Sequence, residues 1–271
     1  MRKSTFIGLS MLTATLLASG AASAGVVYVN GVGIPTGYVP GGFYFDTQTS
    51  YEQVVTATGQ SFAGIFLVDS IKDAFANITY QYGNNSAYLH GVFQNFIADT
   101  IQLPTSSTAG TITFKGGELL YYVSNTNTFT NNQGQATDIA NAATGTLWLA
   151  ADPAVLDAAG HTLIITIPVG GTLTAFSGAS AETLLDVRAG AAGGTAGAYF
   201  DTDTFTAFGG ATTDLLYQGS ANTGASGSFP ISGTNHTKAN VFFAPEPMTL
   251  SLFGAGLVGA AGFGARRRKK A

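Results

Sequence analysis

The chain has no cysteine anywhere in its 271 residues. Disulfide bonds, cysteine nucleophiles and thiolate metal sites are therefore excluded, so an apolar core must supply the stability. Charged residues are also scarce, at 10% of the chain. Between residues 25 and 244, fourteen acids face only four basic residues: Lys72, Lys115, Arg188 and Lys238. We expect no nucleic-acid partner, because binding phosphates needs clustered Lys and Arg.

Recognisable catalytic motifs are missing as well. The three histidines, His90, His161 and His236, lie in neither a Gly-x-Ser-x-Gly nor a His-Glu-x-x-His context. We interpret them as loop or surface residues and predict that the protein is not an enzyme. The alternative is a secreted hydrolase acting on polysaccharide, which would need two carboxylates on opposite sides of a groove.

The first 24 residues have the pattern of a secretory signal peptide. Arg2 and Lys3 precede the apolar run Phe6–Ala18, and Ala22-Ser23-Ala24 fits the small-residue cleavage site. Signal peptidase would then leave Gly25 as the first residue of the exported protein. An uncleaved N-terminal anchor is the alternative interpretation.

A second signal lies in residues 245–271. Pro245-Glu246-Pro247 is followed by the uncharged run Met248–Ala265, which as a helix would span roughly 27 Å, close to a bilayer core. Small residues within this run either provide a helix-packing face or only lower its hydrophobicity. Five cations follow and predict a stop-transfer signal with a cytoplasmic end: Arg266, Arg267, Arg268, Lys269 and Lys270.

This arrangement resembles the bacterial PEP-CTERM sorting signal, in which the same tripeptide, helix and basic cluster occur in this order. The resemblance implies a Gram-negative host, recognition by the membrane enzyme exosortase, and cleavage near Pro245-Glu246-Pro247. It also implies export by the general secretory route, an inner-membrane intermediate and a final place at the cell surface or in the extracellular matrix. Leu185–Ala192 and Tyr199–Thr204 resemble a body type found in PEP-CTERM surface proteins, some of which are linked to cell aggregation and flocculation.

Residues 25–244 hold short runs of alternating apolar and polar residues and no long helical pattern. We predict an all-β fold, a single β-sandwich or jelly-roll-like domain, with the signal helix before it and a transmembrane helix after it. Strands are expected at, among others, Val26–Val29, Phe62–Val68, Leu163–Ile167 and Glu182–Arg188.

Two local structures are predicted from turn and capping residues. Gly116-Gly117 separates Thr111–Lys115 from Glu118–Val123, which indicates a hairpin with a tight turn. Asp152 and Pro153 suit the N-cap and first position of a helix over Ala154–Ala159, which Gly160 would terminate.

Asp201 and Asp203 are two residues apart and are the candidate metal ligands, with Asp186 or Asp214 as further oxygen donors for calcium. The alternative is that these aspartates bond the local backbone in turns. The aromatic residues Tyr80, Tyr82, Tyr121, Tyr122 and Trp148 could stack on sugars or pack in the core, and core packing is favoured for Trp148.

These observations predict an exported surface or matrix protein, processed by exosortase and associated with exopolysaccharide, with a role in aggregation or biofilm. No cofactor is predicted, apart from the calcium alternative. A calcium-dependent glycan-binding module and a secreted hydrolase remain as alternative functions.

Overall fold

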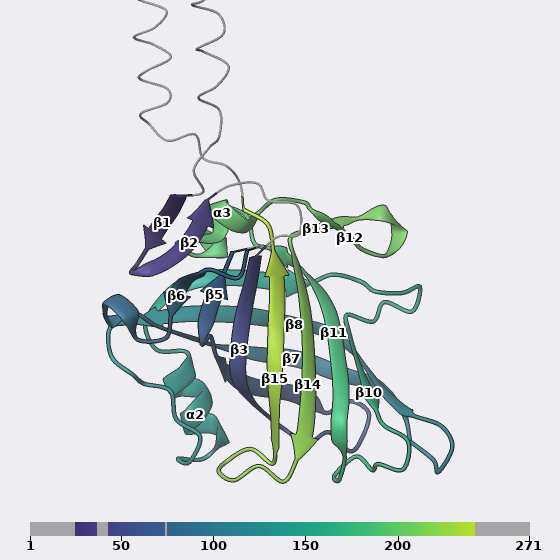
Figure 1. The fold of residues 1–271 in the computed structure, drawn as a ribbon. Coiled ribbons are helices and arrows are strands. Elements are labelled where there is room, and N and C mark those ends of the chain that lie inside the picture. Colours follow the sequence, from purple (N-terminus) through teal and green to yellow (C-terminus); the bar gives the residue numbers. More distant parts are fainter. Residues whose placement is uncertain (1–24, 37–42, 74, 242–271) are drawn as a thin grey trace, which may run out of the picture.

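The computed structural model describes residues 25–36, 43–73 and 75–241. Their main feature is one antiparallel sheet that closes into a barrel-like form of eight strand positions (Figure 1). Its strands are β3 Phe43–Glu52, β4 Ser61–Leu67, β7 Tyr88–Gln102, β8 Gly110–Ser124, β9 Thr146–Pro153, β10 Leu163–Ile167, β11 Ser177–Val187, β14 Leu215–Thr223 and β15 Ile231–Ala239. The strands β9 and β10 share one position, because both lie between β8 and β11.

The sheet closes where β15 pairs with β3, from Ile231 opposite Glu52 to Ala239 opposite Phe43. The predicted all-β class is therefore confirmed, but two facing sheets of a sandwich or jelly roll are not formed. Closure pairs the two edges with each other, which removes the exposed edge that an open sheet would present.

Short elements cover the end of the barrel at which the described chain begins (Figure 1). They are β1 Gly25–Val29, β2 Val32–Thr36, η1 Asn84–Ser86, η2 Gly190–Gly193, α3 Gly197–Phe200, β12 Phe205–Thr206, η3 Phe208–Gly210 and β13 Thr212–Thr213. Two further short strands, β5 Ser70–Lys72 and β6 Ile78–Gln81, extend the main sheet, because β5 pairs with β3 and β6 pairs with β5. The β1–β2 hairpin is tied to the barrel, because Trp148 Nε1 donates a 3.2 Å hydrogen bond to the Val29 carbonyl. Val32 and Ile34 are fully buried in this cap.

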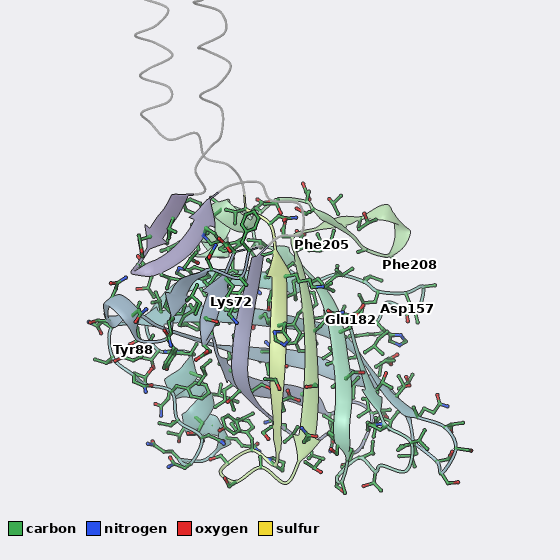
Figure 2. All side chains as sticks on the ribbon, viewed as in Figure 1. Lys72, Tyr88, Asp157, Glu182, Phe205 and Phe208 are labelled. Atoms are coloured by element: carbon green, nitrogen blue, oxygen red, sulfur yellow. The ribbon has the colours of Figure 1, made fainter. Side chains whose placement is uncertain are left out.

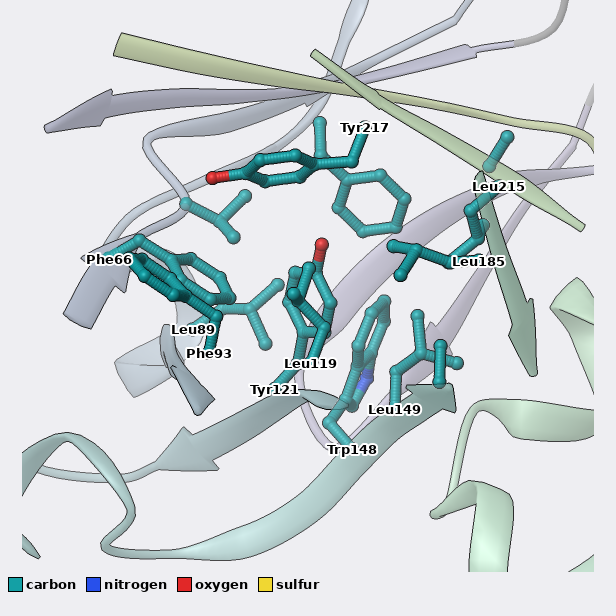
Figure 3. Packing of buried hydrophobic residues seen from close by; sticks show 14 of the residues in the cluster. Phe66, Leu89, Phe93, Leu119, Tyr121, Trp148, Leu149, Leu185, Leu215 and Tyr217 are labelled. Carbon is teal, nitrogen blue, oxygen red and sulfur yellow. The ribbon is translucent and has the colours of Figure 1, made fainter. Parts of the chain in front are cut away.

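The barrel interior holds the main hydrophobic core. Alternate residues of each strand point inward, and large side chains such as Phe66, Tyr121, Trp148 and Tyr217 meet there (Figure 3). Phe45, Trp148 and Phe200 form ring contacts with centroids 5.4–5.9 Å apart.

A second, smaller core lies on the outer face of the sheet. The helix α2 Gln135–Ala142 packs there with Phe129, Phe229, Ile65 and Leu120. This layer explains why β4 is buried along both faces, as its uninterrupted apolar sequence predicted.

The predicted hairpin at Gly116-Gly117 is wrong, because β8 runs through both glycines as one strand of 15 residues paired with β7. The glycines have φ values of +68° and +103°, and they bend the strand instead of reversing it. A Cβ atom on Gly117 would lie 2.4 Å from the ring of Phe96. The position is glycine because an inward aromatic ring occupies the space that a side chain would need.

The predicted helix over Ala154–Ala159 is also wrong, because Asp152 and Pro153 end β9 and the next residues form a turn. Asp157 Oδ1 accepts hydrogen bonds from the backbone N–H groups of Ala159 and His161, which stabilises this turn. No helix within the described ranges is long and apolar enough to cross a membrane. The expected signal helix, and the expected span Met248–Ala265, lie outside those ranges.

Candidate functional site

A mainly apolar cavity lies inside the barrel. Its walls include Phe62, Phe93, Phe114, Leu119 and Leu163, which come from β4, β7, β8 and β10. The volume open to the centres of water molecules is about 40 Å³, whereas one water needs roughly 10–15 Å³ on that measure. The cavity therefore suits a small guest. Leu173 and Phe176, which are half-buried in the loop 168–176, also line it and mark where it approaches the surface.

Glu52 is the one acidic residue among the described residues that line this cavity. It ends β3 and is only 8% exposed. Ser50 Oγ donates a 2.9 Å hydrogen bond to Oε1 of Glu52. Among the described residues, this is the one side-chain hydrogen bond to the Glu52 carboxylate. Burial raises the pKa of Glu52 to about 7, although the Ser50 hydrogen bond acts in the opposite direction.

Two tyrosines extend the polar region inside the barrel. Tyr121 Oη and Thr237 Oγ1 lie 3.2 Å apart, which joins β8 to β15 across the interior. Figure 3 shows the hydroxyl of Tyr121 directed toward the side of the interior on which Tyr217 lies. Burial raises the pKa of Tyr217 well above its usual range, and the nearby Glu52 adds to this shift. Both phenols are therefore neutral hydrogen-bonding groups at ordinary pH.

The side chains that line this cavity include few ionisable groups. The described lining residues include no histidine, lysine or arginine. They offer a single carboxyl group, whereas glycoside hydrolysis uses two at a defined separation. The sequence analysis did not single out Glu52. The only signal is that Ser50 and Glu52, two residues apart, share one face of a strand, and many solvent-exposed strands show the same pattern.

The candidate metal ligands Asp201 and Asp203 lie in the loop between α3 and β12. The neighbouring Asp214 is fully buried and accepts hydrogen bonds from the backbone N–H groups of Val187, Thr202 and Asp203. Asp203 Oδ1 accepts a 2.6 Å hydrogen bond from Thr212 Oγ1. The side chain of Asp214 thus bonds the backbone, as the alternative interpretation predicts, whereas the side chain of Asp203 bonds the hydroxyl of Thr212.

The same aspartates repel one another. Burial, a hydrogen bond with Asp214 and the charges of Asp214, Asp203 and Asp201 together raise the pKa of Asp186 to about 6. The pKa of Asp201 is also raised, first by burial and then by the nearby Asp214 and Asp203 carboxylates. Nevertheless, no group of three or more His, Cys, Asp or Glu side chains in the described part of the chain is placed to hold a metal ion.

Two of the histidines have clear structural roles. His161 lies between two carboxylates, with Nδ1 2.6 Å from Asp157 Oδ2 and Nε2 3.0 Å from Asp99 Oδ2. The hydrogen bond with Asp157 is the main cause that raises the pKa of His161. Lys115 Nζ also pairs with Asp99, at 3.1 Å. Because Asp99 lies on β7 and Lys115 on β8, these contacts fasten the loop 157–161 to the barrel.

The prediction that the histidines are loop or surface residues is wrong for His90, which is fully buried in β7. Its Nδ1 atom lies 2.8 Å from the Ala142 carbonyl, and its Nε2 atom lies 3.2 Å from Thr128 Oγ1. A neutral ring satisfies both contacts if Nδ1 donates and Nε2 accepts. Burial lowers the pKa of His90. The ring thus joins β7 to the C-terminal end of α2, which is a role in packing.

The exposed fractions of the candidate aromatic side chains agree with the core-packing interpretation for the most buried of them. Trp148, Tyr121 and Tyr80 are at most 2% exposed and cannot stack on a sugar. Tyr82 and Tyr122 are half-buried. Aromatic residues that the sequence analysis did not select are more exposed, namely Tyr28, Phe75 and Phe208, and Figure 2 shows Phe208 on the arm that projects beside β12.

Comparisons of the chain with protein-family models, with curated proteins and with solved structures find no match. The residues of the expected sorting signal, Pro245-Glu246-Pro247 and Arg266–Lys270, lie outside the described ranges, as do Ala22 and Ala24. Gly25, the expected first residue after signal cleavage, begins β1.

Proposed function

We propose that this chain is an exported, non-enzymatic surface or matrix protein that exosortase processes at Pro245-Glu246-Pro247. In this proposal residues 25–244 form the displayed body. The C-terminal segment holds the body at the inner membrane until cleavage transfers it to the cell surface or the matrix.

The observation that carries this proposal is the position of the two ends of the body. β1 begins, and β15 ends, at the same end of the barrel (Figure 1). Signals attached at Gly25 and after Val241 would therefore both leave from one side. The opposite end, with the loops after β10 and β14, would point away from a membrane that held either signal.

The body is further proposed to associate with exopolysaccharide and to promote aggregation. Its excess of acidic residues favours solubility outside the cell. The exposed rings of Tyr28, Phe75 and Phe208 offer surfaces on which sugars could stack. Co-sedimentation of the protein with the polysaccharide of its producing strain, with and without a chelator, tests this association. Binding that survives chelation supports it, and binding lost on chelation favours the calcium-dependent module.

The sorting step is tested separately with three variants in the producing strain. Full-length protein should reach the surface fraction, whereas a chain ending at Ala244 should be released into the medium. Glu246→Ala should accumulate uncleaved in the inner membrane if exosortase reads the tripeptide. Glu182→Ala alters an exposed acid on the outside of the barrel and should behave like wild type. Normal surface retention of the chain ending at Ala244 would contradict the proposal.

A further inference from the structure

The cavity in the barrel has the lining of a binding site for a small apolar molecule. Phe62, Phe93, Phe114, Leu163 and Ile165 contribute side chains without polar atoms to its walls. A water molecule is poorly stabilised in such a space, because it needs two to four polar hydrogen-bonding partners. An apolar guest would restore the dispersion contacts that an unfilled cavity forgoes.

The size of the cavity limits the length of the guest. About 40 Å³ is open to the centres of water molecules, which is room for about three or four waters. A chain of three carbons with one polar atom at its end fits this space, and a much longer chain does not. Leu173 and Phe176 are only half-buried and are the residues past which such a chain would enter. Their loop, 168–176, follows β10 and carries a single isolated bridge, between Thr172 and Ala175.

The polar lining selects the end group of the guest. Glu52 is the one carboxylic acid among the described lining residues. The same residues include no lysine, arginine or histidine that could pair with a carboxylate on the ligand. Of its two carboxyl oxygens, Oε1 accepts the hydrogen bond from Ser50. The other oxygen can accept one more hydrogen bond, from a donor on the guest. A guest carboxylate would instead meet a like charge in a desolvated site.

We propose that the barrel interior binds a single-chain aliphatic molecule whose polar end donates a hydrogen bond to Glu52, a primary amine or an alcohol. This inference goes beyond the proposed sorting and surface role and does not depend on it. The shared chemistry is an apolar chain with a donor at its end, and the test separates amines from alcohols.

The test uses the protein recovered from its producing cells and isothermal titration calorimetry. Propylamine, 1-propanol and propionate are titrated at pH 8, where Glu52 is mainly ionised, so the chain is constant and only the end group changes. Propylamine and 1-propanol should bind, and propionate should bind at least about ten-fold more weakly. Equal binding of propionate and propylamine, or no binding of either donor at the highest concentration that leaves the protein folded, would overturn the proposal.

Three variants place the binding inside the barrel. Ala181→Phe adds a ring to the cavity wall and should abolish binding, whereas Ala198→Phe makes the same change on the exposed face of α3 and should leave it intact. Glu52→Gln should reduce the preference for propylamine over propionate. Ala221→Leu, which fills the cavity from β14, is measured in parallel in case Ala181→Phe does not fold. Wild-type affinity in a folded, cavity-filled variant would contradict an internal site.

Discussion

The hydroxyl of Ser50 donates a 2.9 Å hydrogen bond to Oε1 of Glu52 inside the barrel. Both residues lie on β3, and both are buried, Ser50 completely. An ionised carboxylate in this position has one neutral donor to offset the loss of its hydration. The pKa of about 7 follows from this imbalance, and it makes the stability of the barrel depend on pH.

Glu52→Gln should therefore stabilise the protein in alkaline solution. The pKa of Glu52 is raised from 4.5 in the unfolded reference to about 7 in the folded protein. The folded state thus binds the proton more tightly, and stability falls as the pH rises from 4.5 to 7. Above pH 7 the amide variant should be more stable by about 2–3 kcal/mol, and at pH 4 the difference should be small.

Thermal unfolding at pH 4, 6 and 8 measures this difference for wild type, Glu52→Gln and Glu182→Gln. The last variant is the control, because Glu182 is an exposed acid on β11 (Figure 2). Identical pH profiles for wild type and Glu52→Gln would show that Glu52 does not carry a raised pKa.

His161→Gln should destabilise the protein most in mildly acidic solution. The two carboxylates of Asp157 and Asp99 raise the pKa of His161 above 6.5. The stabilisation is fully present below pH 6.5 and is lost as the pH rises through the folded pKa. The melting temperature of the variant should thus be lower than that of wild type at pH 6, and the two should converge at pH 9. A difference that grows with pH would contradict the ion cluster.

The contribution of His90 to stability should depend on pH in the opposite way to that of His161. Burial lowers the pKa of His90 below 6.5, so the neutral ring stabilises the fold above that pH, and the contribution is lost as the pH falls. An NMR titration that follows the imidazole C2 protons should give His90 a pKa below 6.5 and His161 a pKa above it. The reverse order would refute the tautomer and contacts assigned to the two rings.

Calcium should leave the melting temperature unchanged. Asp214 already accepts three backbone hydrogen bonds, and Asp203 accepts one from Thr212. Thermal unfolding with millimolar calcium or with a chelator checks this for wild type, Asp201→Asn and Asp203→Asn. A stabilisation by calcium that either variant removes would instead support the calcium-dependent module and make Asp201 and Asp203 metal ligands.

Gly117→Ala should cost more stability than Gly178→Ala. Both glycines have a positive φ, +103° and +76°, so alanine strains the backbone at each position by roughly 1–2 kcal/mol. Only at Gly117 would the new methyl group also lie 2.4 Å from Phe96, whereas nothing lies within 4 Å at Gly178. Equal losses in denaturant unfolding would show that the Phe96 ring moves aside freely.

Strand content could be predicted from the sequence because alternation is a local property. The runs at Val26–Val29 and Leu163–Ile167 form strands as expected, and Phe62–Val68 does so apart from its last residue. The errors occurred where one residue type suits two structures. Gly116-Gly117 permits a turn or a bend within a strand, and the choice depends on Phe96, which lies on another strand. Asp152-Pro153 suits a helix start, but in the folded chain β8 and β11 pair with β9 up to this point.

The sequence by itself determined the all-β class, the acidic body, the absence of cysteine chemistry and the expectation of export and sorting, because each depends on composition or on a contiguous pattern. Only the tertiary structure decided that the sheet closes, that Gly116-Gly117 lie within one strand, and that Glu52 lines an apolar cavity. Closure pairs β3 with β15, whose residues are nearly two hundred positions apart in the chain. A carboxyl group acquires its raised pKa from what surrounds it in space, and no local pattern around Glu52 records those neighbours.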